Sequence, residues 1–203
     1  MKATLRKATL DDINALCDVY MSAFTHEIFS RQVFPRLSGT GRAYWLQAFS
    51  EELQEPDATF LVATDPASST PDKIVGYVKW VRPDAVAQDY SEDGYPEDGL
   101  PEVASEFYKQ LFEGHKRNMC DTRHWYLDMM AVEKDSMGKG LARQMMEWGL
   151  QKAREDGMVC FVEATADAKL FYEHFGFREI DRMGVDTPEG RAEVIFMVRD
   201  IDS

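Results

Sequence analysis

The sequence has few cysteines, few basic residues and no long apolar run. Only three cysteines occur among 203 residues, Cys17, Cys120 and Cys160, and they lie far apart. Their odd number and the lack of a CxxC or Cys/His cluster argue against a disulfide framework or a zinc site, and favour a reduced, cytoplasmic setting without a bound metal. With no run of about eighteen apolar residues and no apolar N-terminal segment, neither a membrane span nor a signal peptide is expected.

Basic residues are outnumbered by acidic ones. The chain has 23 lysines and arginines against 36 aspartates and glutamates, a net charge of −13. Binding of nucleic-acid phosphates needs a basic face, so no nucleic-acid partner is expected. The acidic balance suits a cationic small molecule or a basic protein tail, although solubility alone explains it more simply. At 44% hydrophobic residues the chain can fill a core, and its length predicts one domain, residues 1–203.

Hydrophobic periodicity divides the chain into strands and helices. The expected elements are a strand at 3–8, a helix after Thr9, a helix at 41–54, strands at 59–64 and 73–81 joined by the turn DPASSTPD, a helix at 102–118, a strand at 124–132, a helix at 138–153, a strand at 158–164, a helix at 166–174 and strands at 177–183 and 192–199. No basic residue occurs between Arg82 and Lys109, which predicts a solvated acidic insert at 83–106. The strand–helix–strand unit after the insert predicts parallel pairing.

Two glycines, Gly138 and Gly140, stand where an amphipathic helix is expected to begin, in the segment KDSMGKGLARQ. Glycine in a helix costs about 1 kcal/mol relative to alanine. The pair therefore either forms a tight turn or serves to expose backbone amides. The first amides of a helix lack intrahelical partners and carry the positive end of its dipole, and an anion can approach them closely where no Cβ intervenes. The segment therefore predicts a pyrophosphate cradle, although it matches neither the dinucleotide-binding fingerprint nor the Walker loop.

Residues 164–177, ATADAKLFYEHFGF, resemble the second signature of the GNAT superfamily of acyl-CoA N-acyltransferases, a small-residue helix that ends in a tyrosine before a Gly-Phe step. The first signature, [QR]-x-x-G-x-[GA], falls on DSMGKG, with Gly138 and Gly140 in register and Asp135 where Gln or Arg is usual. The resemblance covers most of the chain and is greatest to small-molecule members, including divergent fungal ones. It implies an α/β (α+β) fold with a mixed, mostly antiparallel central sheet, splayed at the acyl-CoA site and flanked by helices.

The resemblance implies acetyl-CoA, or another short acyl-CoA, as the cofactor. The residues that it assigns to cofactor binding are Met130, Ala131, Val132, Asp135, Met137, Gly138, Lys139, Gly140, Leu141, Ala142, Arg143, Thr165, Lys169, Phe171 and Tyr172. Asp135 removes a polar or cationic contact to the pyrophosphate. Lys139 and Arg143 are expected to offset that loss.

Two catalytic roles follow from the resemblance. It implies a bulged strand at residues 130–132, whose Met130 N–H points at the thioester carbonyl and stabilises the oxyanion. It also implies that Tyr172 stands beside the CoA sulfur, where a phenol can donate a proton or a hydrogen bond to the leaving thiolate. The alternative for Tyr172 is a core tyrosine that packs the last helix.

The third role, removal of the amine's proton, is assigned from strand alternation. Alternation puts one set of side chains, His124, Tyr126 and Asp128, on one face of the strand and the other set, Trp125, Leu127 and Met129, on the opposite face. Asp128 is the candidate base, because a lone carboxylate in an apolar strand is costly unless it is paired or used. A structural salt bridge is the alternative role for this residue.

In the superfamily the acceptor site lies between the loop after the first helix, the early strands and the variable insert. The residues assigned to it are His26, Glu27, Phe29, Trp45, Tyr77, Trp80 and Tyr126, with the insert as a cover. The expected function is acetyl-CoA-dependent acetylation of a primary amine of a small molecule, by a monomer or a homodimer. A protein lysine or N-terminal acetyltransferase and a non-catalytic acyl-CoA-binding protein are the alternatives.

Overall fold

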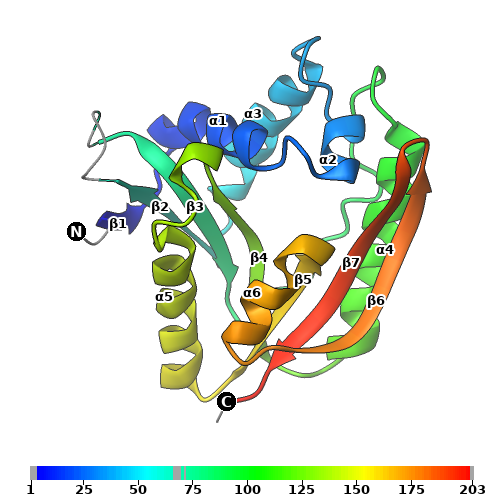
Figure 1. Ribbon diagram of the computed structural model, residues 1–203. Helices are drawn as coiled ribbons and strands as arrows, with labels where there is room; N and C mark the ends of the chain where they lie inside the picture. Colours follow the sequence, from blue (N-terminus) through cyan, green and yellow to red (C-terminus); the bar gives the residue numbers. More distant parts are fainter. Residues whose placement is uncertain (1–3, 66–69, 71, 202–203) are drawn as a thin grey trace.

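A seven-stranded sheet with helices on both faces forms the centre of the molecule (Figure 1). The structure is a computed structural model that describes residues 4–65, 70 and 72–201. The strands are β1 (Thr4–Lys7), β2 (Ala58–Thr64), β3 (Ile74–Val81), β4 (His124–Val132), β5 (Val159–Thr165), β6 (Arg178–Thr187) and β7 (Gly190–Arg199). The helices are α1 (Ile13–Ala23), α2 (Ile28–Val33), α3 (Thr40–Glu52), α4 (Pro101–Met119), α5 (Leu141–Asp156) and α6 (Lys169–His174), with 3-10 turns η1 (Leu10–Asp12), η2 (Lys134–Ser136) and η3 (Ala166–Ala168).

The strand order is β1-β2-β3-β4-β5-β7-β6, and every neighbouring pair is antiparallel except β4 and β5. Helix α5 connects those two strands, so the expected parallel strand–helix–strand unit is confirmed. Their pairing is short: it runs from His124 opposite Val159 to Leu127 opposite Val162. Beyond it, β4 continues along β3 and β5 continues along β7, so the two central strands separate. The mixed, mostly antiparallel sheet with a splay at its centre is therefore confirmed.

Strand β4 contains a bulge just where it leaves β5. Lys79 of β3 lies opposite Met129, whereas the next residue, Trp80, lies opposite Leu127, so Asp128 is the extra residue. A bulge of this kind leaves one residue outside the regular ladder and bends the strand. The resemblance implied a bulged strand at residues 130–132, and the structure places the irregularity two residues earlier.

The bulge reverses the side-chain alternation of β4. Trp125 and Leu127 belong to the core beneath α5, and Met130 packs against that same core. Met129 instead packs against the core beneath α1 and α3. The expectation that Met129 shares a face with Trp125 and Leu127 is therefore wrong, because an extra residue in one strand shifts all later side chains to the opposite face.

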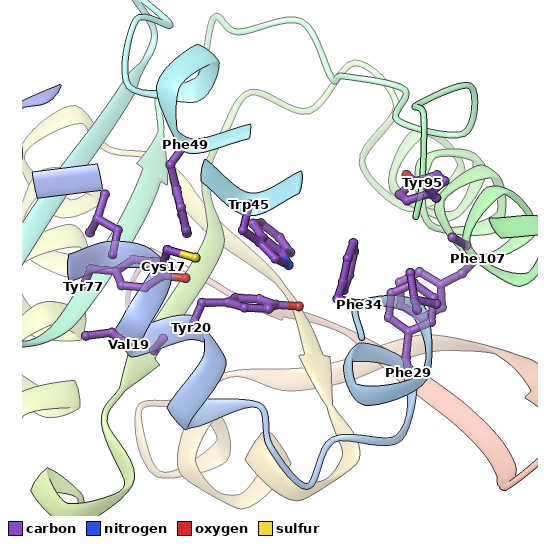
Figure 2. Close-up of a cluster of buried hydrophobic side chains, with 14 of the residues drawn as sticks. Cys17, Val19, Tyr20, Phe29, Phe34, Trp45, Phe49, Tyr77, Tyr95 and Phe107 are labelled. Carbon is purple, nitrogen blue, oxygen red and sulfur yellow. The ribbon is translucent and has the colours of Figure 1, made fainter. Parts of the chain in front are cut away.

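Two apolar layers cover the faces of the sheet. The larger layer is aromatic and joins α1, α2, α3 and α4 to the sheet (Figure 2). In it the rings of Tyr20 and Trp45 lie 3.9 Å apart, and those of Phe29 and Phe107 stack at 3.8 Å. The second layer lies under α5 and α6 and includes Trp80, which is fully buried. Helix α4 packs on β6 and β7, so it covers the half of the sheet beyond the splay.

Three expectations about the elements need correction. Helix α5 begins at Leu141 with Gly140 as its N-cap, whereas the sequence pattern predicted a start near Gly138. Helix α2 occupies a segment expected to be a loop, and α4 begins at Pro101, inside the predicted acidic insert. Most of the expected turn DPASSTPD, residues 66–69 and 71, lies outside the described residues.

Candidate functional site

The start of α5 is open in the way that an anion cradle requires. Gly138 and Gly140 have φ of +77° and +79°, in the left-handed region that favours glycine. A Cβ placed on either residue meets no atom within 4 Å. The 16-residue helix that follows directs its first amides and the positive end of its dipole at this open space. These features fit the pyrophosphate of an acyl-CoA.

The charges around the cradle are mixed. Lys139 contacts Asp65 with Nζ 3.0 Å from Oδ2, and Arg143 contacts Glu147 at 2.8 Å. Asp135 and Met137 are exposed in the loop before the glycines. Both cations expected to offset Asp135 therefore have carboxylate partners.

Most of the remaining residues assigned to the cofactor lie on the face of the sheet that α5 and α6 cover, whereas Ala131 belongs to the aromatic core on the opposite face. Met130 packs against the core that contains Val132, Leu141 and Tyr172. Tyr172 is 7% exposed, and burial raises the pKa of its phenol, so it stays protonated and able to donate. Ala142 lies on α5, Thr165 ends β5, and Phe171 and Lys169 lie on α6, where Lys169 contacts Glu179 at 2.7 Å.

The opposite face of the splay opens into a cavity of about 300 Å³. Its walls come from β3, β4, β5, the second half of α4, Arg82 and residues 83–90 of the acidic insert. Asp128 and Glu163 both line it, and they are the first residues of β4 and β5 beyond the last paired position. The cavity thus has two carboxylates where the central strands separate. One stretch of the insert forms a wall of it.

Asp128 belongs to a buried ion cluster around Lys79. The Lys79 Nζ lies 2.8 Å from Asp128, 3.0 Å from Glu52 and 3.2 Å from Glu55, and its side chain is 1% exposed. Burial disfavours the Lys79 ammonium, but Asp128 and Glu52 hold its pKa well above the usual range. The candidate base is therefore ion-paired, which was the structural alternative for this residue.

Glu163 lies in a second polar cluster on the same face. Its Oε1 is 3.1 Å from His115 Nδ1, and its Oε2 accepts a hydrogen bond from the Tyr126 hydroxyl at 2.6 Å. The far side of the His115 ring contacts His124, with 3.0 Å between the two Nε2 atoms. Burial raises the pKa of Glu163, although its contacts with His115 and Tyr126 oppose this shift. Sequence reasoning missed Glu163, yet it is a lone carboxylate in an apolar strand, the criterion that selected Asp128.

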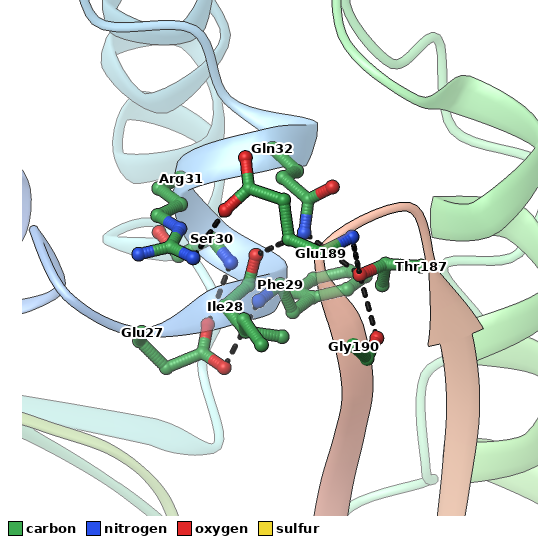
Figure 3. Close-up of polar contacts among 9 residues, drawn as sticks. All are labelled: Glu27, Ile28, Phe29, Ser30, Arg31, Gln32, Thr187, Glu189 and Gly190. Carbon is green, nitrogen blue, oxygen red and sulfur yellow. Dashed lines mark hydrogen bonds and ion pairs between the residues drawn. The ribbon is translucent and has the colours of Figure 1, made fainter.

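Most residues assigned to the acceptor site lie elsewhere. Glu27 caps α2 by accepting hydrogen bonds from the backbone N–H groups of Phe29 and Ser30 at 3.0 and 2.6 Å (Figure 3). Phe29 is buried against Phe107, and His26 lies on the surface near Lys134. Trp45 and Tyr77 belong to the aromatic core. Tyr126 alone among the assigned acceptor residues lines the cavity.

Trp80 is also removed from the cavity, because it points to the other face of the sheet. Its indole packs against α5 at Gly149 and donates a hydrogen bond to the Met145 carbonyl at 3.3 Å. Helix α2, which carries Glu27 and Phe29, is fixed against the β6–β7 turn by the Gln32–Thr187 hydrogen bond at 2.8 Å and the Arg31–Glu189 ion pair (Figure 3). Six of the seven residues assigned to the acceptor site therefore lie away from this cavity.

Within residues 4–65, 70 and 72–201, no group of three His, Cys, Asp or Glu side chains is arranged to hold a metal ion. In the same ranges, none of the helices has the length and apolar character required to cross a bilayer.

The model of a GNAT acetyltransferase domain matches residues 56–179 of the chain. A structure from Corynebacterium glutamicum, histone acetyltransferase HPA2 and related acetyltransferase, is 20% identical, with 98% of this chain and 97% of that chain covered and a TM-score of 0.63. The ribosomal-protein-S18-alanine N-acetyltransferase of Escherichia coli is 17% identical, with coverage of 98% and 94% and a TM-score of 0.60. An N-acetyltransferase from Staphylococcus aureus Mu50 is 13% identical, with 99% of both chains covered and a TM-score of 0.60. At these identities the similarity establishes a common fold.

Proposed function

Because the chain belongs to the GNAT family of acetyltransferases, we propose that it transfers an acetyl group from acetyl-CoA directly to a primary amine of a small molecule. One observation supports the choice of acceptor above all others. The splay opens into a walled cavity of about 300 Å³, within the size range of small-ligand pockets. Two carboxylates stand at its inner edge, where an ammonium group would approach the thioester.

The cofactor side of the reaction uses the residues on the α5 and α6 face. Acetyl-CoA, when bound, supplies the acetyl group as a thioester. The first amides of α5 hold its pyrophosphate at Gly138 and Gly140. The Met130 N–H donates a hydrogen bond to the thioester carbonyl oxygen as negative charge develops there. The Tyr172 phenol donates to the departing sulfur, and its raised pKa keeps the donor proton in place at neutral pH.

Two alternatives make different demands on the structure. A protein lysine or N-terminal acetyltransferase needs an open groove for the peptide; the Escherichia coli structure is named as an enzyme that acts on a protein. Here residues 82–90 and α4 wall the cavity, which favours a small acceptor. A non-catalytic acyl-CoA-binding protein would bind the cofactor without transfer, and only a turnover assay separates it from an enzyme.

The first experiment is calorimetric titration of the purified protein with acetyl-CoA, with CoA and with NAD as the control. We expect binding of acetyl-CoA at micromolar concentration and none of NAD. A panel of small primary amines is then assayed for CoA release, beside a lysine-containing peptide and an N-terminal alanine peptide. Transfer to peptides alone would replace the small-molecule acceptor, and binding without turnover on either panel would identify a binding protein.

The cradle is tested by Gly140→Leu, with Gly157→Leu as the matched control. Gly157 caps the opposite end of α5 with φ of +63°, and it too has no atom within 4 Å of its Cβ position. Both variants impose the same kind of backbone strain, about 1 to 3 kcal/mol. Only Gly140→Leu places a side chain at the helix N-terminus, so it should weaken acetyl-CoA binding by about 10-fold or more while Gly157→Leu does not. Equal affinities in calorimetry would remove the cradle from α5.

A further inference from the structure

Glu163, His115 and His124 form a hydrogen-bonded chain from the inner edge of the cavity to the last turn before β4. The three side chains come from β5, α4 and β4, and all three line the cavity. Their contacts are 3.1 Å from Glu163 Oε1 to His115 Nδ1 and 3.0 Å from His115 Nε2 to His124 Nε2. The chain ends at the Thr122 carbonyl, 2.6 Å from His124 Nδ1.

The end of this chain fixes the tautomers of both rings. A carbonyl oxygen only accepts, so His124 Nδ1 carries a hydrogen. Burial lowers the pKa of His124 to about 4, and the ring is therefore neutral near pH 7, with a lone pair on Nε2. That lone pair accepts the hydrogen of His115 Nε2. His115 Nδ1 is then left facing the Glu163 carboxylate, so one further proton can be held between these two atoms.

The position of Glu163 suits it to meet the acceptor. It is the first residue of β5 beyond the last position paired with β4, on the face that opens into the cavity. The Tyr126 hydroxyl orients its second oxygen at 2.6 Å. Asp128, across the splay, is ion-paired with the Lys79 ammonium at 2.8 Å, so one of its oxygens is already engaged by a buried cation.

We infer that Glu163 and His115 together form the base that takes the proton of the acceptor's ammonium group, and that His124 is a positioning residue that holds His115 in the required tautomer. This inference rests on the proposed function. The ammonium gives one proton to the gap between Glu163 and His115 Nδ1. The free amine then forms the C–N bond, the C–S bond breaks, and the second amine proton goes to the thiolate.

The groups that face this pair come from several elements. They are Tyr126, His124 and Asp128 of β4, Lys79 of β3 and Tyr90 of the insert, while β7 presents the apolar Phe196. The pair accepts a proton only while the gap between Glu163 and His115 is empty. Because acid fills the gap before the substrate can, the rate of transfer should rise with pH on the acidic side of the profile and then level off.

The kinetic test compares Glu163→Gln with Glu155→Gln, an exposed carboxylate on α5, in the full-length protein. An amine accepted by the wild type is the substrate. Glu163→Gln should lower kcat by about 100-fold or more and remove the acidic limb of the profile, since general-base catalysis contributes on this scale. Acetyl-CoA affinity should stay within about 2-fold, and Glu155→Gln should match the wild type. Wild-type kcat and an unaltered acidic limb in Glu163→Gln would overturn the inference.

A second pair of measurements covers the histidines. His124→Gln should move the acidic limb without changing acetyl-CoA affinity; a fall in kcat with an unmoved limb would mean a structural role and refute positioning. If Glu163→Gln does not fold, as judged by thermal unfolding, His115→Gln takes its place with the same expectations. Nitrogen NMR of histidine-labelled protein, without substrate, should show hydrogen on His124 Nδ1 and His115 Nε2 at neutral pH. The opposite tautomers would overturn the inference.

These outcomes separate the two levels of the proposal. If no amine or peptide is acetylated, the proposed function fails and the inference fails with it. If acetylation occurs and Glu163→Gln behaves as the wild type, only the inference fails. Loss of the acidic limb in Asp128→Asn, with the limb retained in Glu163→Gln, would assign the base to Asp128.

Discussion

Lys79 is a single buried cation with three carboxylate neighbours, Glu52, Glu55 and Asp128. Removing one partner of a buried ion pair leaves an uncompensated charge and costs about 3 to 5 kcal/mol. The three carboxylates around one ammonium also repel one another. The cluster therefore holds Asp128 in place beside the splay.

Glu52, another carboxyl of this cluster, has a raised pKa that predicts a pH dependence of stability. Burial raises the pKa of Glu52 from 4.5 to about 7, with Lys79 opposing the shift and Asp128 adding to it. Between these pH values the folded protein keeps a proton that the unfolded chain has released, so the free energy of unfolding falls as the pH rises through the window. In the wild type the free energy of unfolding should fall by on the order of 2 kcal/mol across this window, and Glu52→Gln should remove this fall.

The measurement is urea unfolding of wild type and variant at several pH values between 4.5 and 8. Glu55→Gln is the matched control, because it removes another carboxylate from Lys79 and leaves Glu52 in place. The difference between Glu52→Gln and wild type should grow in favour of the variant as the pH rises. Parallel curves would show that Glu52 is ionised in the folded protein throughout.

At the scale of one element, α5 uses glycine in two ways: Gly140 caps its N-terminus, and Gly149 allows a close approach of the Trp80 ring. Gly149 lies in the middle of the helix, where a Cβ would stand 2.0 Å from the Trp80 ring. Gly149→Ala should destabilise the protein by about 1 to 3 kcal/mol through overpacking, although alanine is the better helix former. Gly94→Ala, at a position with open space around it, should be nearly neutral. A double-mutant cycle with Trp80→Phe should recover part of the loss in urea unfolding; additive effects would mean that the ring does not set the helix distance.

The elements were predictable from sequence wherever a regular pattern determined them. The strands at 59–64 and 73–81 and the helix at 41–54 lie within a residue or two of β2, β3 and α3. Helix α2 was missed because its six residues are too few for a helical period to emerge. The bulge at Asp128 was missed because nothing in the sequence of β4 distinguishes an extra residue from a regular one.

The residues of the candidate site were likewise predictable only where a local sequence pattern determined them. Gly138 and Gly140 were predictable, because a positive φ selects for glycine and leaves a mark in the sequence. The partnership of Glu163 with His115 was not, because the two residues are 48 positions apart and meet only through the packing of α4 on the sheet. Asp128 and Glu163 met the same criterion in sequence, and only their partners, Lys79 and His115, distinguish them.

For the whole molecule, the net charge of −13 acts on any charged ligand before contact. A cationic amine is attracted over the surface and a neutral one is not, and salt screens this field over a Debye length of about 10 Å at 0.1 M. For a cationic acceptor, kcat/KM should fall by about 3-fold or more between roughly 20 and 200 mM NaCl. An acceptor that is uncharged at the assay pH is the control, and the same fall for both would attribute the effect to the protein rather than to attraction.

The short pairing of β4 with β5 has a consequence for the mechanics of the molecule. The seven-stranded sheet consists of two halves, β1 to β4 and β5 to β7 (Figure 1). Only four residue pairs of β4 and β5 join the two halves. Helix α4 follows β3, a strand of the first half, in the chain. It packs on β6 and β7 of the second half, so it links the two halves across the short β4–β5 pairing. His115 of α4 contacts both halves of the sheet, through His124 of β4 in the first half and Glu163 of β5 in the second.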